Sequence, residues 1–192
     1  MSNCLGKGRT RFLASLRVAV WMLVIAPSVQ AQLTPERLRC EHLDNPLGID
    51  VERPRLSWQL WPGSGERGQY QSAWRILVSS SRSKIDHNEG DLWDSGKVAS
   101  EQSILIPYEG MPLTSRQRCW WKVMAWDGQG RPGPWSSPAF WEMALLERGD
   151  WHAKWIAGSG KEETPPPVEP APMFRREFKV SGEVRRARVY VT

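Results

Sequence analysis

Hydrophobic and polar positions alternate most clearly over residues 119–126. One face of this segment would carry Cys119, Trp121, Val123 and Ala125, and the other face Trp120, Lys122, Met124 and Trp126. A period of two predicts a strand that packs on one side. Residues 127–130 supply turn chemistry, and a second extended run reaches residue 141. Such a hairpin needs further strands to bury its apolar face.

The chain before this hairpin supplies those strands. Seven short extended segments are separated by Gly, Pro, Asn and Asp, and no stretch shows sustained helical periodicity. The predicted segments are 38–43, 54–60, 72–81, 92–96, 103–108, 119–126 and 135–141. This pattern is typical of an all-β fold, and it predicts one β-sandwich over residues 32–146.

The first 31 residues have the parts of a secretory signal peptide. Four basic residues and no acid precede the apolar run 18–26, and small residues stand at Val29 and Ala31. An uncleaved anchor is the alternative, but nine apolar residues are too few to span about 30 Å of hydrocarbon. We therefore expect a secreted or periplasmic protein with no membrane contact after cleavage.

The net charge of +5 belongs mostly to this segment. Removing its four basic residues leaves 22 basic against 21 acidic residues. A nearly neutral mature chain argues against nucleic acid as a partner.

A second domain is expected to begin at residue 147. Residues 161–172 form a loop rich in proline and acid, and residues 173–180 and 184–192 alternate like strands. Two or three strands do not bury a core, so residues 147–192 are interpreted as the start of a second β-sandwich that is incomplete.

Cys40 and Cys119 remain after signal cleavage, and both fall on inward-facing strand positions. In an oxidising compartment they could form a disulfide that stabilises the fold by about 4–5 kcal/mol. The alternative, which we favour, is two separate buried thiols, because sequence does not reveal the Cα separation that a bridge requires.

The chain lacks a convincing catalytic residue, metal site or cofactor motif. The pairs Asp91 with Asp94 and Glu162 with Glu163 are the obvious carboxylates, but a turn and a solvated spacer explain them. The three histidines share no ligand spacing with one another or with the cysteines.

The twelve tryptophans are the remaining chemical signal. Exposed indole faces can stack on sugar rings, and Trp93 and Trp126 are the candidates for that role. The alternative, favoured for most of these rings, is burial in the sandwich core or at a domain junction.

Several segments resemble the opening of the secreted bacterial α-L-rhamnosidases, in that family's order. They are LRCEHLDNPLGIDVERPRLSW at 38–58, DLWDSGKV at 91–98, WWKVMAWDGQG at 120–130, GDWHAKWIAG at 149–158, PAPMFRREFKV at 170–180 and ARVYVT at 187–192. The resemblance implies a fibronectin type III/immunoglobulin-like β-sandwich followed by the start of the next β-sandwich domain. Cys119 stands where the fibronectin-type corner tyrosine is usual, so the phenolic hydrogen bond of that corner is not expected.

The resemblance implies an accessory role for this chain. The family releases terminal α-L-rhamnose by inverting hydrolysis between two carboxyl groups, and its catalytic helical barrel would lie beyond residue 192. The expected partners are the remaining domains of the same enzyme and a rhamnose-containing glycan. The alternatives are a free-standing secreted carbohydrate-binding module and a purely structural spacer.

Overall fold

The computed structural model describes residues 33–63, 67–156 and 173–191. The chain divides into two units, Met1–Arg148 and Gly149–Thr192, and each is described by itself. The predicted signal segment and the proline-rich loop lie outside the described residues. No helix in the described part of the chain is long and apolar enough to span a membrane.

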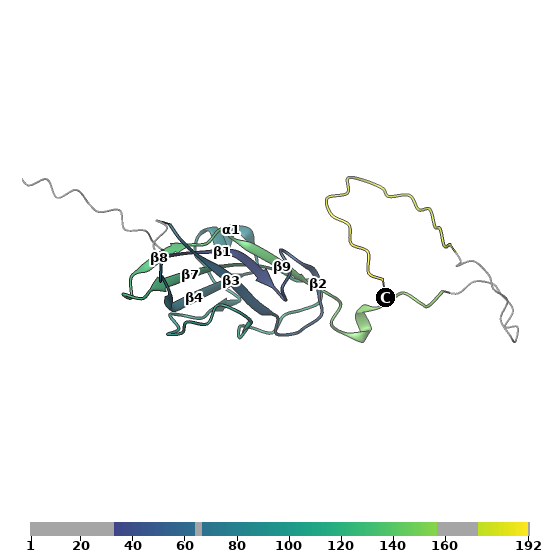
Figure 1. Cartoon of the computed structure of the whole chain (residues 1–192). Coiled ribbons are helices and arrows are strands. Elements are labelled where there is room, and N and C mark those ends of the chain that lie inside the picture. Colours follow the sequence, from purple (N-terminus) through teal and green to yellow (C-terminus); the bar gives the residue numbers. More distant parts are fainter. Residues whose placement is uncertain (1–32, 64–66, 157–172, 192) are drawn as a thin grey trace, which may run out of the picture. The chain divides into compact units, whose positions relative to one another are not determined.

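Two sheets build the first unit (Figure 1). The smaller sheet has the order β1-β3-β6, with β1 at Leu33–Cys40, β3 at Arg55–Pro62 and β6 at Ile106–Pro107. The larger sheet has the order β2-β9-β7-β4-β5, and β8 pairs with β7. Its strands are β2 (Leu47–Ile49), β4 (Gln71–Ser79), β5 (Trp93–Asp94), β7 (Arg118–Asp127), β8 (Pro132–Trp135) and β9 (Ala139–Met143). The prediction of a β-sandwich is confirmed.

Strand β7 supplies the centre of the core. The four residues predicted to face inward, Cys119, Trp121, Val123 and Ala125, are fully buried. The Trp121 ring packs edge-on against Trp141 of β9, with 6.3 Å between ring centroids. Buried aromatic rings of this size dominate core energetics, with a cost of about 3–5 kcal/mol for truncation to alanine.

The first strand lies earlier than the predicted segment 38–43. Strand β1 begins at Leu33 and ends at Cys40, and the two residues after it, Glu41 and His42, have positive φ (48° and 66°). The chain folds back there, and the backbone groups of Cys40 and Leu43 exchange hydrogen bonds of 2.9 and 3.0 Å. Side-chain alternation alone does not reveal this reversal.

The predicted run 135–141 is in fact parts of two strands. Strand β8 ends at Trp135, and β9 starts at Ala139, directly after Pro138. Proline has no N–H for a sheet ladder, so it interrupts the pairing with β7. Segment 103–108 is likewise shorter than expected: β6 has two residues, and Leu105 before it has a positive φ of 56°.

Two short elements were not predicted. Helix α1 (Arg82–Asp86) is a single turn capped by Ser81, whose hydroxyl accepts a hydrogen bond from the Lys84 N–H. One turn is too short to show helical periodicity. Strand β2 pairs in parallel with β9 over three residues, and its burial pattern does not alternate.

The strand predictions for the second unit are wrong within the described residues. Segment 173–191 contains neither strand nor helix, and among the described residues the last regular element before it is a 3₁₀ turn at Arg148–Asp150. The physical reason is that an isolated pair of strands is marginal without a third strand or another packing surface.

The outer face of β7 is also covered, which alternation did not predict. Lys122 is only 4% exposed, and its Nζ donates hydrogen bonds of 2.5 Å to the Ile85 carbonyl and to Asn88 Oδ1. The same ammonium lies 5.2 Å from the centroid of the Trp135 ring. Burial lowers the pKa of Lys122, and these partners fix α1 and β8 to the sheet.

The predicted turn after β7 is organised by Asp127. Its Oδ1 accepts from the backbone N–H groups of Gln129 and Arg131, both at 2.9 Å, and its Oδ2 accepts from Arg131 Nε at 2.7 Å. Gly130 has the positive φ (77°) that the turn requires. The turn chemistry expected of residues 127–130 is confirmed.

Replacing the buried lysine tests its role in holding the outer layer. We expect Lys122→Met to lower the free energy of unfolding by about 1–3 kcal/mol, because two acceptors lose their donor. Urea denaturation at pH 7 measures this. The matched control is Lys97→Met, an exposed lysine above Trp126, which should change stability by less than about 0.5 kcal/mol. Equal effects of the two substitutions on stability would contradict the structural role given to the hydrogen bonds of Lys122.

The Asp127 turn predicts a defined pH dependence. Burial opposes ionisation, but hydrogen bonds from Arg131 and Gln129 outweigh it and hold the pKa of Asp127 below its usual 3.8. A lowered pKa stabilises the fold above the unfolded-state pKa, and this contribution disappears as pH falls through the folded-state value. Asp127→Asn should therefore cost about 1–3 kcal/mol at pH 7. In denaturation curves recorded from pH 7 to 2, the gap between the two proteins should narrow below about pH 4. A gap that is independent of pH would show that the charge is not responsible.

Candidate functional site

The two tryptophans proposed for sugar stacking lie in different places. Trp93 of β5 pairs with Val78 of β4, whereas Trp126 of β7 pairs with Ala73 of β4. Five residues of one strand separate the two positions, or about 16 Å at the usual rise of a strand. The structure therefore does not bring Trp93 and Trp126 into one site.

Trp126 lies on the outer face of the larger sheet, where cations of the same unit cover aromatic rings. Lys97 Nζ is 4.7 Å from the centroid of the Trp126 ring. Trp120 has the Arg82 guanidinium at 5.3 Å, and Trp135 has Arg75 at 5.9 Å. These cation–π contacts occupy ring faces that a ligand would need.

Trp93 has a different environment. Its ring packs perpendicular to Tyr108, at 5.5 Å between centroids, and among the described residues it carries no cation over its face. Half-buried Trp93 lines a cavity of about 280 Å³ between the two sheets. The other lining side chains with polar atoms are Trp74, Ser95, Ser100, Gln102 and Glu109.

Trp74 lines this cavity and also belongs to the buried core cluster. It is 6% exposed, and its ring packs edge-on against Trp58 at 5.9 Å. Trp58 Nε1 donates to Gln71 Oε1 at 3.0 Å, but Trp74 Nε1 is buried with no hydrogen-bond partner in the described part of the chain. Unpaired buried donors are rare and call for an explanation.

The carboxylates near Trp93 are structural. Asp94 forms a two-pronged ion pair with Arg75, at 2.8 and 2.6 Å, and Asp91 accepts from Lys84 Nζ at 2.7 Å and from Ser80. Hydrogen bonds from Arg75 lower the pKa of Asp94. Burial raises that of Asp91, but Lys84 and Ser80 reverse the effect, and the net pKa is lowered. Neither group has the raised pKa of a general acid; Glu162 and Glu163 lie outside the described residues.

Comparison with known proteins identifies the first unit. A family model described as "Rha78A-like, N-terminal immunoglobulin domain" matches residues 35–147. The chain belongs to this family. The fold and the assignment that the sequence predicted are thereby confirmed.

Curated relatives of this Rha78A-like domain are α-L-rhamnosidases. One from Streptomyces avermitilis is 42% identical over 132 residues, which are 69% of this chain and 12% of the relative. Another from Alteromonas sp. (strain LOR) is 36% identical over 190 residues, or 96% of this chain and 20% of the relative. The chain thus spans about a fifth or less of the length of these relatives.

Solved structures agree with this assignment. The crystal structure of Streptomyces avermitilis α-L-rhamnosidase complexed with L-rhamnose matches with a TM-score of 0.61 and 42% identity, covering 65% of this chain and 12% of that one. The α-L-rhamnosidase from Dictyoglumus thermophilum matches with a TM-score of 0.62 and 40% identity, covering 67% and 14%.

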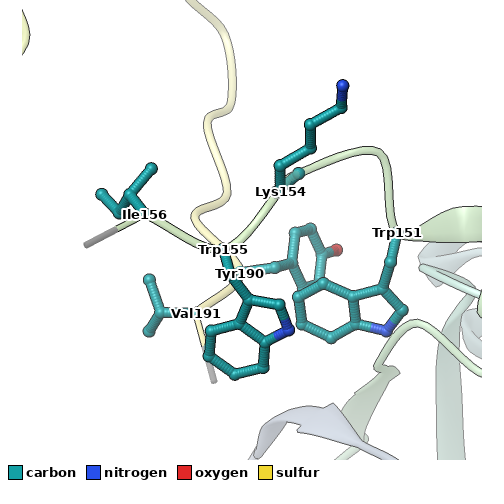
Figure 2. A pocket seen from close by; sticks show the side chains of 7 residues that line it. Trp151, Lys154, Trp155, Ile156, Tyr190 and Val191 are labelled. Carbon is teal, nitrogen blue, oxygen red and sulfur yellow. The ribbon is translucent and has the colours of Figure 1, made fainter. Parts of the chain in front are cut away.

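The unit after the Rha78A-like domain has a hollow of its own. A space of about 580 Å³ is lined by Trp151, Ala153, Lys154, Trp155, Ile156, Tyr190 and Val191, and Figure 2 shows these side chains. Trp155 is 89% exposed, and Val189 and Val191 are more than 80% exposed. Apolar side chains this open are typical of a surface that another part of a protein covers.

Both cysteines of the Rha78A-like domain are buried, and the structure has no bond between them. They belong to the same core cluster. Burial raises the pKa of Cys119 to about 12, and it also raises the pKa of Cys40. A disulfide between them in an oxidising compartment remains a prediction.

Thiol counting distinguishes the two cysteine states. In a Cys4→Ser chain, Cys40 and Cys119 are the only thiols. At pH 8 a thiol of pKa about 12 is ionised in about one molecule in ten thousand, so Ellman's reagent should detect no thiol in the native protein. Unfolding in guanidinium without reductant should release two. A count of zero after unfolding, which rises to two after reduction, would instead establish the bridge.

Proposed function

We propose that this chain is the N-terminal accessory part of a longer secreted or periplasmic α-L-rhamnosidase-like glycoside hydrolase. The longer enzyme would release terminal α-L-rhamnose from glycosides or polysaccharides by inverting hydrolysis. Membership of the Rha78A-like family, with rhamnosidase relatives five or more times longer than the matched region, carries this proposal.

Catalysis is assigned to other domains of that enzyme. Inverting hydrolysis needs a general acid with a raised pKa and a base across a gap that admits water. Among the described residues, each carboxylate with a shifted pKa has that pKa lowered by an ion pair or by turn hydrogen bonds. The described part of the chain also contains no group of three or more His, Cys, Asp or Glu that could hold a metal ion.

The second unit supports a junction with the next domain. Its exposed apolar residues include Trp155, Phe178, Val189 and Val191. We assign residues 147–192 to the start of a second β-sandwich, whose other strands would cover these side chains and complete the pairing that segment 173–191 lacks. In this arrangement the remaining domains of the enzyme are the main partners.

A free-standing secreted carbohydrate-binding module is the second candidate. The observation in its favour is the cavity beside Trp93, which combines indole rings with polar side chains. In this case the chain would bind a glycan without a hydrolytic partner.

Activity assays separate the two functions. We expect the purified chain to release no 4-nitrophenol from 4-nitrophenyl α-L-rhamnopyranoside, and we expect the gene's reading frame to continue past Thr192 and encode a protein that does. The matched substrate control is 4-nitrophenyl α-D-glucopyranoside. Hydrolysis by the chain alone would contradict the assignment of catalysis to other domains of the enzyme. A stop codon after Thr192 would instead favour the binding module.

A further inference from the structure

The cavity beside Trp93 is lined by the edge strands of both sheets. Strand β5 is the edge of the larger sheet and β6 is the edge of the smaller one. Trp93 comes from β5, and Ile106 and Pro107 come from β6. The wall between them is completed by Ser95, Val98, Ser100 and Gln102, so both sheets and one loop contribute to a single hollow.

We propose that this cavity binds one neutral sugar ring, presented as a residue of a glycan. Sugar rings combine apolar C–H faces with hydroxyl groups, and a binding site for them therefore needs an aromatic wall together with hydrogen-bonding side chains. The cavity provides both in one place.

The aromatic wall is the ring of Trp93. The rings of Trp120, Trp126 and Trp135 each carry a cation of the same domain at 4.7 to 5.9 Å. Trp93 instead meets Tyr108 perpendicularly, and the Tyr108 hydroxyl is held 2.9 Å from the Met111 carbonyl oxygen and 3.2 Å from that of Leu92. The indole is therefore positioned by packing and remains open to an apolar sugar face.

The polar side chains offer both donors and acceptors. Gln102 Nε2 donates to the Ile104 carbonyl at 3.0 Å and retains a second amide hydrogen. Ser100 Oγ accepts from the Gln102 N–H at 3.1 Å and still has its own proton to donate. Glu109 is exposed and, when ionised, accepts only. Hydroxyl groups can satisfy all three, because each hydroxyl both donates and accepts.

Charge and volume restrict the ligand further. None of the described residues that line the cavity is lysine or arginine, and Glu109 disfavours an anion, so a uronic acid or a phosphate does not fit. A volume of about 280 Å³ lies at the lower limit for small-molecule pockets, which suits one ring rather than a chain.

Trp74 adds an independent observation. It lines the cavity, and its buried Nε1 donor has no partner in the described part of the chain. An indole N–H only donates, so the missing group is an acceptor. A sugar oxygen that displaces the side chains now shielding Nε1 would supply it.

The location of the site does not depend on the proposed function, but the choice of rhamnose as first probe rests on it. The test is a titration of the ¹⁵N-labelled full chain with methyl α-L-rhamnopyranoside, with methyl α-D-glucopyranoside and methyl α-D-galactopyranoside in parallel. Indole N–H resonances report directly on the tryptophans. We expect the signals of Trp74 and Trp93 to move in a saturable way, and that of Trp126 to stay in place.

Paired variants locate the binding. Glu109→Gln and Trp93→Phe should each raise the dissociation constant by about tenfold, the effect of one good hydrogen bond or stacking contact. The matched controls are Glu52→Gln, an exposed carboxylate elsewhere in the domain, and Trp126→Phe, and neither should change the dissociation constant. Glu109 is exposed, so its variant tests the site even if Trp93→Phe loosens the fold.

Each other outcome overturns a defined statement. Binding of a glucoside or galactoside without the rhamnoside keeps the sugar site and rules out rhamnose as its ligand. Absence of a shift with all three sugars at 50 mM, or a shift only with a cation such as choline, overturns the sugar site and leaves the accessory-domain proposal standing. Binding that is lost in Trp126→Phe but kept in Glu109→Gln places the ligand on the outer face instead.

Discussion

Burial of one face of β7 is the constraint on which the rest of this domain depends. Cys119, Trp121, Val123 and Ala125 lie at the centre of the larger sheet, between β4 and β9, and they need a second sheet to exclude water from them. The smaller sheet provides that cover through β3, whose Leu56 and Trp58 are buried in the same cluster. The cavity beside Trp93 exists because the two sheets close on this core but not along the β5 and β6 edges.

The opposite face of β7 is rich in aromatic rings, and cationic side chains cover several of them. Arginine and lysine side chains lie over Trp120, Trp126 and Trp135, where they cover apolar area and keep their charged groups near water. Lys122 is the most deeply buried of these cations. Its ammonium group donates to the Ile85 carbonyl of α1 and to Asn88 Oδ1. Trp93 is set apart from these rings by the absence of a cation over it in the described part of the chain, and this contrast makes it the better binding candidate.

Ion pairs and turns use most of the acidic groups that could have suggested chemistry. Asp94 pairs with Arg75, Asp91 with Lys84 and Glu41 with Arg55. Each pair ties one segment of the sandwich to another, as Glu41 does by accepting from both the backbone and the side chain of Arg55. A domain with its carboxylates engaged in this way suits positioning and binding, and this agrees with a family in which the matched region is a small part of a much longer enzyme.

The sequence by itself determined the class of fold, the inward face of β7, the turn at Asp127 and the resemblance to rhamnosidases, because each depends on local alternation or on residue identity. Only the tertiary structure decided where strands end at positive φ, as after Cys40, and where a proline divides one apparent strand into β8 and β9. It also decided that Trp93 and Trp126 lie apart and that Trp74 has an unpaired donor beside the cavity. These features depend on which strands pair and in which register, and side-chain alternation along a single segment does not encode them.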